Sequence, residues 1–430
     1  MDDERAARAP GEPAVDHPPP DLPPLLLTDP PGDVIVDLGA LADFARDLAA
    51  GSGPVAIDAE RASGYRYSQR AYLIQIRRAG AGTALIDPHA VMRAQRRSDA
   101  ADLGQIDRAI GPAEWILHAA TQDLPCLAEV GMRPRRLFDT ELAGRLLGRD
   151  RVSLAALVAS ELGLHLAKGH GSADWSLRPM TPAQLHYAAL DVEALADLRA
   201  ILEAELHARD RWAWAEQEFH ALLNFQPKAR SQDAWRRTSG IHRLRKPRQL
   251  AIVRALWGAR DALAAAADIA PGRVLPDAAI IAAAQGMPTS PEALIATEGF
   301  TGRGQRRRAQ QWMAAILDAL DLTDAECPPV HAPQDGPPQP RLWAERNPPA
   351  ARRLAAVRPA IERLSGELGI AAEVLISPST VRDLCWQPPT DSSLADALAQ
   401  RNARPWQITL VEPVIAPAID QFCPPSDSHG

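Results

Sequence analysis

The alternation of short apolar runs with amphipathic stretches most restricts the fold of this 430-residue chain. Between residues 34 and 206, segments of helical spacing alternate with five runs typical of strands: 54–58, 71–78, 83–87, 114–118 and 136–139. The first three runs are close together, whereas helical stretches separate the later ones. This order predicts a mixed sheet flanked by helices, which is an α/β domain.

Helical spacing dominates the rest of the chain. Within the α/β part it covers 38–50, 124–131, 153–163 and 182–206. From Trp212 to about Leu320 no convincing strand pattern appears, and helical spacing is found in 250–267 and 302–320. Residues 348–400 have mostly helical spacing again. The sequence therefore predicts one α/β domain followed by two small all-α domains, as expected at about 100–200 residues per domain.

Proline-rich segments indicate the domain boundaries. Nine prolines within residues 1–33 predict a disordered tail, and CPPVHAPQDGPPQP (327–340) predicts a linker. The expected organisation is a tail 1–33, the α/β domain 34–210, a helical connector and domain 211–325, a linker 326–340, a C-terminal helical domain 341–420 and a short tail 421–430.

Composition excludes several protein classes. There is no run of about 18 apolar residues, and the acidic, proline-rich N-terminus lacks the apolar core of a secretory signal, so we expect neither a membrane span nor secretion. The four cysteines are far apart and form no CxxC pair, which argues against disulfides and zinc and favours the cytoplasm. With a net charge of −7, contact with nucleic acid must depend on local basic patches or metal ions.

Paired carboxylates end the first strand, in VAIDAE. Asp58 and Glu60 are at positions i and i+2, so both point to the same strand face. Like charges held this close repel each other, and a bound cation is the usual means of neutralising them. A solvated strand end would give the same short pattern.

Two further segments place carboxylates near helices. Asp123, in HAATQDLPCL, is at or near a helix start, where it could equally cap the helix. Tyr187 and Asp191 have the i, i+4 spacing of one helical face, which an ordinary amphipathic helix also gives. Taken together, the four carboxylates could hold two divalent cations, Mg²⁺ or Mn²⁺, for phosphoryl displacement, with the tyrosine positioning the attacking water.

The order DAE, HAATQDLPCL and YAALD resembles the three exonuclease motifs of the tyrosine branch of the DEDD superfamily. The surrounding stretches resemble ribonuclease D in 64–78, 137–148, 154–163, 166–195 and 234–237. Segment 250–320 is similar to the helicase-and-RNase-D C-terminal (HRDC) domain, and 341–415 is similar to the further HRDC-like domain of ribonuclease D proteins.

This resemblance implies a ribonuclease-H-like catalytic domain followed by two small all-α HRDC-type domains. It implies 3′→5′ removal of nucleoside 5′-monophosphates from RNA, with tRNA precursors carrying 3′ extensions as the characteristic substrate. The metal ligands would be Asp58, Glu60, Asp123 and Asp191, and Tyr187 would orient the water. Ala59 departs from the family, which more often has threonine there, and this change could alter contact with the terminal nucleotide.

Other residues are candidates for substrate binding. His118 could contact substrate or make a structural hydrogen bond, Lys168 could meet a phosphate, and Trp175 could stack on a base or fill the edge of a core. The interleaved Tyr65, Arg66, Tyr67 and Arg70 could grip a strand or serve packing and solvation. A basic turn at a predicted helix start could contact the phosphate backbone or be merely solvated: Arg303, Arg306, Arg307 and Arg308.

Two alternative functions stay open from the residues alone. The same site could act on DNA, because two-metal chemistry does not itself inspect the 2′-hydroxyl. The chain could instead be an RNA-binding scaffold with structural carboxylates. The sequence carries no signal for an oligomeric state.

Overall fold

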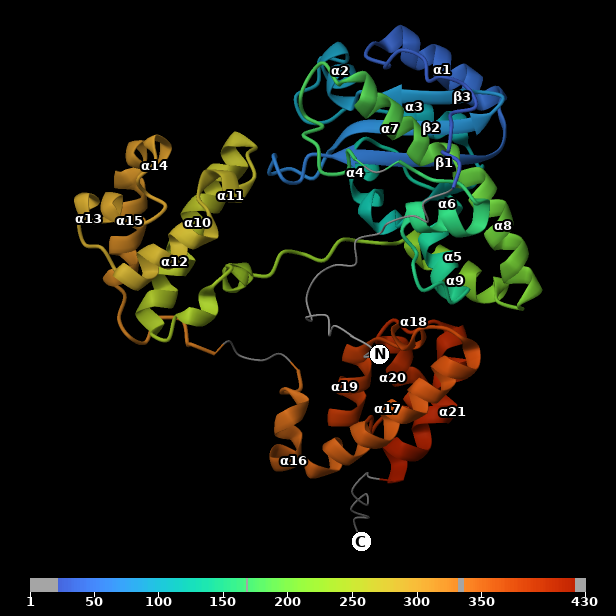
Figure 1. The fold of residues 1–430 in the computed structure, drawn as a ribbon. Coiled ribbons are helices and arrows are strands. Elements are labelled where there is room, and N and C mark those ends of the chain that lie inside the picture. Colours follow the sequence, from blue (N-terminus) through green and yellow to red (C-terminus); the bar gives the residue numbers. More distant parts are fainter. Residues whose placement is uncertain (1–21, 168, 332–335, 422–430) are drawn as a thin grey trace, which may run out of the picture.

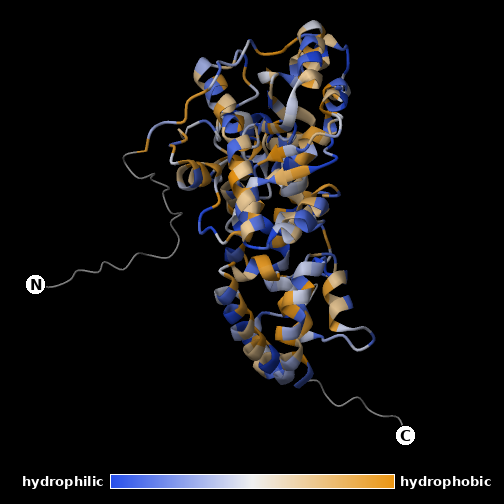
Figure 2. Cartoon of the chain, turned by 90° about the vertical axis from the view of Figure 1, so that its right-hand side faces the viewer, coloured by the Kyte–Doolittle hydropathy of each residue, from blue (hydrophilic) through white to orange (hydrophobic). Residues whose placement is uncertain are grey.

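The computed structural model describes residues 22–167, 169–331 and 336–421. Figure 1 shows an α/β domain, a first helical domain that ends with α15 (Ala309–Leu320), and a C-terminal domain whose first labelled helix is α16 (Trp343–Arg346). This arrangement confirms the predicted fold class. Within the described residues no helix is long and apolar enough to cross a membrane, and Figure 2 shows hydrophilic residues mixed with hydrophobic ones along the helices.

The sheet of the α/β domain has the strand order β3-β2-β1-β4-β5. The β1–β2 and β2–β3 pairs are antiparallel, and the β1–β4 and β4–β5 pairs are parallel. All five predicted strands are present: β1 Ser52–Arg61, β2 Ala71–Ala79, β3 Gly82–Ile86, β4 Trp115–Leu117 and β5 Leu137–Asp139. Their apolar side chains are buried because helices pack against the sheet.

The four predicted helical ranges of this domain are all helical, and the structure adds α2, α3, α5 and α9, which the sequence analysis did not predict. The predicted helix 182–206 consists of α7 and α8, which are separated by Ala194. The helices are α1 Leu38–Ala50, α2 Pro88–Ala94, α3 Gly104–Ile110, α4 Leu124–Glu129, α5 Thr140–Leu146, α6 Leu154–Leu162, α7 Pro182–Glu193, α8 Leu195–Ala208 and α9 Trp212–Leu222.

Helix α7 covers the face of the sheet on which the candidate carboxylates lie. It begins with a capping box, in which Thr181 and Gln184 each accept a hydrogen bond from the other's backbone N–H. It packs against β1, β2 and β3, and the small side chains of Ala188 and Ala189 are fully buried there. This close approach brings Tyr187 and Asp191 to the strand that carries Asp58.

The first helical domain has its own core around Trp235, Ile280 and Trp312. The predicted helix 302–320 is divided into α14 and α15 at Arg308. The elements are η2 Ala234–Arg237, η3 Ile241–Arg243, α10 Pro247–Ala267, α11 Pro271–Val274, α12 Asp277–Gly286, α13 Pro291–Ala296, α14 Arg303–Arg307 and α15 Ala309–Leu320.

The C-terminal domain shares a continuous core with the α/β domain. Trp406 stacks on Trp214 of α9 with ring centroids 4.9 Å apart, and its indole N–H donates to Glu218 at 2.9 Å. The elements are η4 Pro340–Leu342, α16 Trp343–Arg346, α17 Pro348–Leu368, α18 Ala372–Leu375, α19 Pro378–Trp386, α20 Leu394–Gln400 and α21 Pro405–Gln421.

Residues 22–33 differ from the predicted disordered tail. Leu25 donates its backbone N–H to His165 at 2.8 Å, and Leu25 and Leu27 pack against the core. The prediction is wrong for these residues. It was based on their high proline content and did not take into account the two leucines that pack against the core. The rest of the predicted tail, residues 1–21, lies outside the described residues.

Candidate active site

Strand β1 presents Asp58 and Glu60 on the face that α7 covers. The antiparallel register places Asp58 opposite Gln75 and Glu60 opposite Leu73 on β2. Asp58 is half-buried, and Glu60 is only 9% exposed. The i, i+2 spacing predicted from the sequence therefore sets both carboxylates into a covered surface instead of open solvent.

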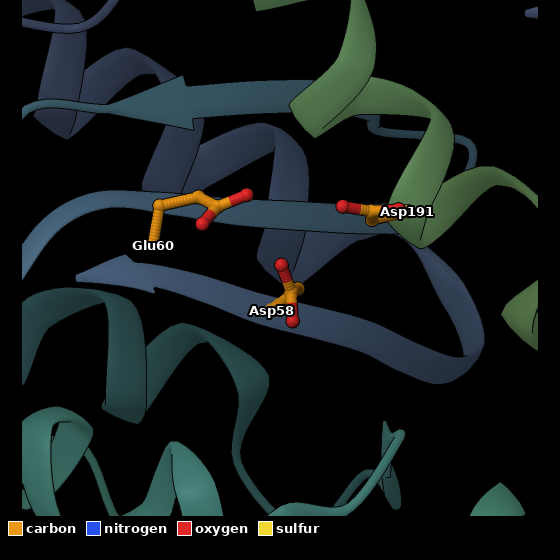
Figure 3. A group of neighbouring side chains, drawn as sticks. All are labelled: Asp58, Glu60 and Asp191. Atoms are coloured by element: carbon orange, nitrogen blue, oxygen red, sulfur yellow. The ribbon is translucent and has the colours of Figure 1, made fainter. Parts of the chain in front are cut away.

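Asp191 completes a carboxylate cluster from α7. Oxygen atoms of Asp58, Glu60 and Asp191 all lie within 4.8 Å of one another. Figure 3 shows Glu60 and Asp191 pointing toward each other above Asp58. Three of the four predicted metal ligands are thus brought together by one strand and one helix.

The electrostatics of this cluster favour a bound cation. Burial raises the pKa of Asp58 to about 6, and burial together with Asp58, Asp191 and Asp123 raises the pKa of Glu60 to about 10. Burial and Asp58 also raise the pKa of Asp191 well above its ordinary value. A divalent cation would relieve this repulsion, and an all-oxygen ligand set suits Mg²⁺ or Mn²⁺ better than zinc.

A buried amide beside the cluster also favours a bound cation. Gln75, opposite Asp58, is fully buried, and neither its amide oxygen nor its amide nitrogen has a hydrogen-bond partner among the described residues. A buried amide without partners costs about 1–3 kcal/mol for each polar group. A hydrated cation held by Asp58 would offer such an amide hydrogen-bond partners, so these residues fit a metal centre.

Asp123 lies beside the cluster but is not among the carboxylates within 4.8 Å. It is 4% exposed and occupies the N-cap position of α4, yet its side chain makes no capping hydrogen bond. Its nearest cation is Arg61, at 3.9 Å. Burial and Asp58 raise its pKa well above the ordinary value, so its carboxylate is electrostatically linked to the cluster without serving as a helix cap.

Tyr187 is one helical turn before Asp191 and is half-buried. Its ring makes an edge contact with His170, with centroids 5.7 Å apart. Burial, Asp191 and Glu60 raise its pKa, so the phenol keeps its proton at neutral pH. The side chain therefore offers a neutral hydroxyl, able to donate and accept, at the edge of the cluster.

Asp139 is a supporting residue that the sequence analysis missed. Its buried carboxylate accepts hydrogen bonds from the backbone N–H groups of Ala119 at 3.1 Å and Ala120 at 2.8 Å. It also accepts from Glu141 and Leu142, which caps α5. The first two bonds hold the turn that leads to Asp123, in which Ala119 has φ 57°, and the other two join the carboxylate to the start of α5. The sequence LFDTEL indicates that Asp139 caps a helix. Its hydrogen bonds to the backbone of Ala119 and Ala120 depend on the pairing of β4 with β5, which the sequence does not show.

Three of the candidate substrate-binding residues have different outcomes. His118 has its Nδ1 2.9 Å from the Thr140 hydroxyl, which is the structural hydrogen bond that the sequence also allowed. Trp175 is fully buried and its indole fills the core beside α7, which is the packing alternative that the sequence also allowed. Lys168 lies outside the described residues.

The interleaved segment after β1 is used largely for contact with the first helical domain. Tyr67 donates its hydroxyl to Asp261 at 3.1 Å, and the Arg273 guanidinium lies 4.2 Å from the Tyr65 ring centroid. Arg66 donates to Ser176 at 2.8 Å. These contacts support the packing interpretation of the segment.

The basic turn predicted to contact RNA lies on α14 and at the residue after it. Arg303, Arg306 and Arg307 are exposed, and Arg308 is half-buried. In Figure 1 this helix is well separated from β1 and α7. The turn is therefore no part of the carboxylate site, and its contact with RNA stays a prediction.

Three family models match the chain. A 3′-5′ exonuclease model matches residues 34–207, the HRDC domain model matches residues 249–316, and a model of the 3′ to 5′ exonuclease C-terminal domain matches residues 336–419. The first of these ranges contains Asp58, Glu60, Asp123, Tyr187 and Asp191.

Individual relatives give the same picture. Ribonuclease D of Nitrobacter hamburgensis is 34% identical over 229 residues, which are 51% of this chain and 58% of the relative. Ribonuclease D of Acidiphilium cryptum is 32% identical over 269 residues, 59% of this chain and 67% of the relative. The first three curated relatives are matched over only 55–59% of their own length.

A solved structure extends the similarity to nearly the whole chain. The crystal structure of a protein from Bifidobacterium adolescentis is 38% identical and superposes with a TM-score of 0.85. The match covers 93% of this chain and 100% of that one. The arrangement of one α/β domain and two helical domains is therefore shared.

Proposed function

The chain belongs to the ribonuclease D family, and we propose that it shortens RNA from its 3′ end, one nucleoside 5′-monophosphate at a time. The observation that carries this proposal is the cluster of Asp58, Glu60 and Asp191, whose carboxylate oxygens lie within 4.8 Å of one another (Figure 3). Tyr187 lies one helical turn before Asp191. Such a cluster at a strand end suits hydrolysis of a phosphodiester.

We propose that the cluster and Asp123 together hold two divalent cations, Mg²⁺ or Mn²⁺. When bound, the cations would supply positive charge to the scissile phosphate and lower the pKa of the attacking water. Because the pKa values of Asp58 and Glu60 are raised, these carboxyls give up protons when they become ligands.

The protein's own groups set the direction of attack. The protonated Tyr187 hydroxyl, one turn from Asp191, would hydrogen-bond the attacking water and aim its oxygen at phosphorus. The water oxygen bonds to phosphorus while the bond from phosphorus to the preceding nucleotide's 3′-oxygen breaks. The RNA keeps a 3′-hydroxyl, and the released nucleotide carries the 5′-phosphate.

The substrate class and setting are also proposals. The ribonuclease D relatives support RNA as substrate, with tRNA precursors that carry 3′ extensions as the specific case. The absence of disulfides among the buried Cys126, Cys327 and Cys385 supports a reducing cytoplasm. We also propose the domain boundaries 34–210, 211–325 and 341–420, with residues 22–33 packed against the first of these domains.

A time course on 5′-labelled, tRNA-like RNA with a short 3′ extension tests this proposal, beside a matched DNA and with Mn²⁺ or chelator. We expect a ladder of RNAs shortened from the 3′ end, only with metal. Faster loss of the DNA would favour a deoxyribonuclease instead. RNA that stays bound but is never shortened would favour the non-catalytic scaffold.

A further inference from the structure

The connector between α9 and α10 concentrates positive charge in an acidic chain. Residues 228–246 contain a single acidic residue, Asp233, and seven basic ones: Lys228, Arg230, Arg236, Arg237, Arg243, Arg245 and Lys246. The whole chain has 47 basic and 54 acidic residues. No part of the proposed carboxylate site uses this charge.

Part of this charge surrounds a cavity of about 900 Å³, which we call the connector cavity. Arg236 and Arg245 come from the connector, whereas Arg341 and Arg346 come from η4 and α16 of the C-terminal domain. His242 and His331 also border it. Among the described residues that line it there is no Asp or Glu.

The cavity has a fixed apolar floor. Leu244 and Leu250 are 2% and 3% exposed and belong to the core of the first helical domain. Arg236 is held by its own contacts, since its guanidinium lies 4.3 Å from the Trp235 ring centroid and donates to the Pro329 carbonyl at 3.1 Å. The arginines of the connector cavity thus surround a floor of buried side chains that belong to a packed core.

The other three arginines of the connector cavity are not paired with any carboxylate of the described residues. Arg245, Arg341 and Arg346 are exposed, and none of the ion pairs found among the described residues includes them. Like charges gathered around one cavity repel each other, and the attraction of an anion in the cavity to each of them would offset that repulsion.

A second basic cavity in the same domain shows the contrast. It is lined by Arg230, Arg260 and Asp277 among others. There Arg260 pairs with Asp277 at 2.6 Å, and Arg230 pairs with Asp261 at 2.7 Å. Two of its four basic residues are thus paired with carboxylates, and Asp277 lies in its wall, whereas no carboxylate of the described residues lines the connector cavity.

We propose that the connector cavity binds the phosphodiester backbone of the RNA body that precedes the 3′ end. This inference rests on the proposed function, because it assigns the site a part of the same substrate. Arginine is suited to phosphate because of its planar, bidentate donor geometry. In Figure 1, α16 is well separated from β1 and α7, so only an RNA longer than the few nucleotides at the carboxylate cluster can reach both places.

The test removes two exposed cavity arginines in the double variant Arg341→Ala/Arg346→Ala. The control is Arg363→Ala/Arg382→Ala, two exposed C-terminal-domain arginines that lie outside the cavity. Fluorescence anisotropy with a labelled hairpin RNA and chelator measures binding without catalysis. We expect about tenfold weaker binding by the cavity variant and a salt-dependence slope reduced by about 1, with the control unchanged.

A second measurement separates this site from the catalytic one. Turnover of a tetranucleotide with Mn²⁺ should equal that of the unchanged protein in both variants, while shortening of the hairpin RNA slows only in the cavity variant. Unchanged affinity and salt slope would overturn the proposal, as would competition by polyglutamate as effective as that by RNA. If the unchanged protein shortens no RNA, the proposed function fails, but the anisotropy result still decides whether the cavity binds RNA.

Discussion

At the residue scale, the alternation of a strand and the periodicity of a helix bring the carboxylates of Asp58, Glu60 and Asp191 together, and these carboxylates repel one another. Strand alternation aligns Asp58 with Glu60, and α7 adds Asp191 from above. Without a cation, protonation is the way to reduce this repulsion, which is why the pKa values of these carboxyls are raised. The stability of the metal-free protein must therefore depend on pH in a direction that the cluster determines.

The metal-free protein should lose the cluster's contribution to stability as pH rises. The folded-state pKa of Asp58 is about 6 and that of Glu60 about 10, both above their unfolded values of 3.8 and 4.5. Their contribution is complete below about pH 4 and is lost as pH rises through the folded values. The test is thermal unfolding in chelator. As the pH is raised from 4 to 8, the Tm of the unchanged protein should fall relative to the Tm of Asp58→Asn.

The comparison with Asp58→Asn is necessary because other carboxyls act in the opposite direction. A hydrogen bond from Arg149 lowers the pKa of Glu161, which adds stability as pH rises through the acid range. This contribution cancels in the difference. A Tm difference that is constant from pH 4 to 8 would contradict the raised pKa of Asp58.

Tyr187→Phe should separate water positioning from metal binding. The variant loses the hydroxyl but keeps the ring contact with His170, so the helix and the carboxylates stay in place. We expect kcat to fall about 100-fold, as for loss of a group that handles the attacking water's proton. Mn²⁺ affinity, measured by calorimetry, should not change, and a parallel loss of both would show that Tyr187 supports the ligands instead.

At the element scale, the Asp139 carboxylate forms hydrogen bonds with the turn that precedes Asp123. The carboxylate joins the end of β5 to the 119–120 backbone and to the start of α5. Asp139→Asn should lower activity about 10- to 100-fold, because an amide cannot accept from all these N–H groups. Asp102→Asn is the control, since Asp102 accepts a backbone N–H at the start of α3. Equal activity of the two variants would remove this role from Asp139.

What the sequence could predict follows from the range of each interaction. The spacings of Asp58 with Glu60 and of Tyr187 with Asp191 are local, so the sequence singles out these two pairs, and the resemblance to ribonuclease D implies their roles. The role of Asp139 was not predicted, because it depends on β4 and β5 being neighbours. Trp175 was assigned a possible contact with a base because its burial under α7 leaves no local signal.

At the scale of the whole molecule, the three domains are joined unequally. The C-terminal domain and the α/β domain share one core, in which Trp406 stacks on Trp214. The first helical domain has a separate core and meets the α/β domain through polar contacts such as those of Asp268 with Ser68 and Tyr72. The sequence predicted the helical segments. It did not predict which domains share a core, because that depends on contacts between residues far apart in the sequence.

Calorimetry should therefore resolve two unfolding transitions, one for each core. Trp312→Ala removes a fully buried side chain from the first helical domain and should destabilise that transition by about 3–5 kcal/mol. The transition of the other two domains should keep its Tm. A single transition that shifts as a whole would show that the polar contacts couple the two cores.

The central claim is that the carboxylate cluster directs metal-dependent hydrolysis at the 3′ end of RNA. Its most direct test is to digest a tRNA-like RNA in water enriched in oxygen-18 and to analyse the released nucleotides by mass spectrometry. We predict nucleoside 5′-monophosphates with one labelled phosphate oxygen, formed with Mn²⁺, absent with chelator and nearly absent with Asp191→Asn. Nucleotides without the label, or labelled nucleotides released equally well by Asp191→Asn, would contradict the account.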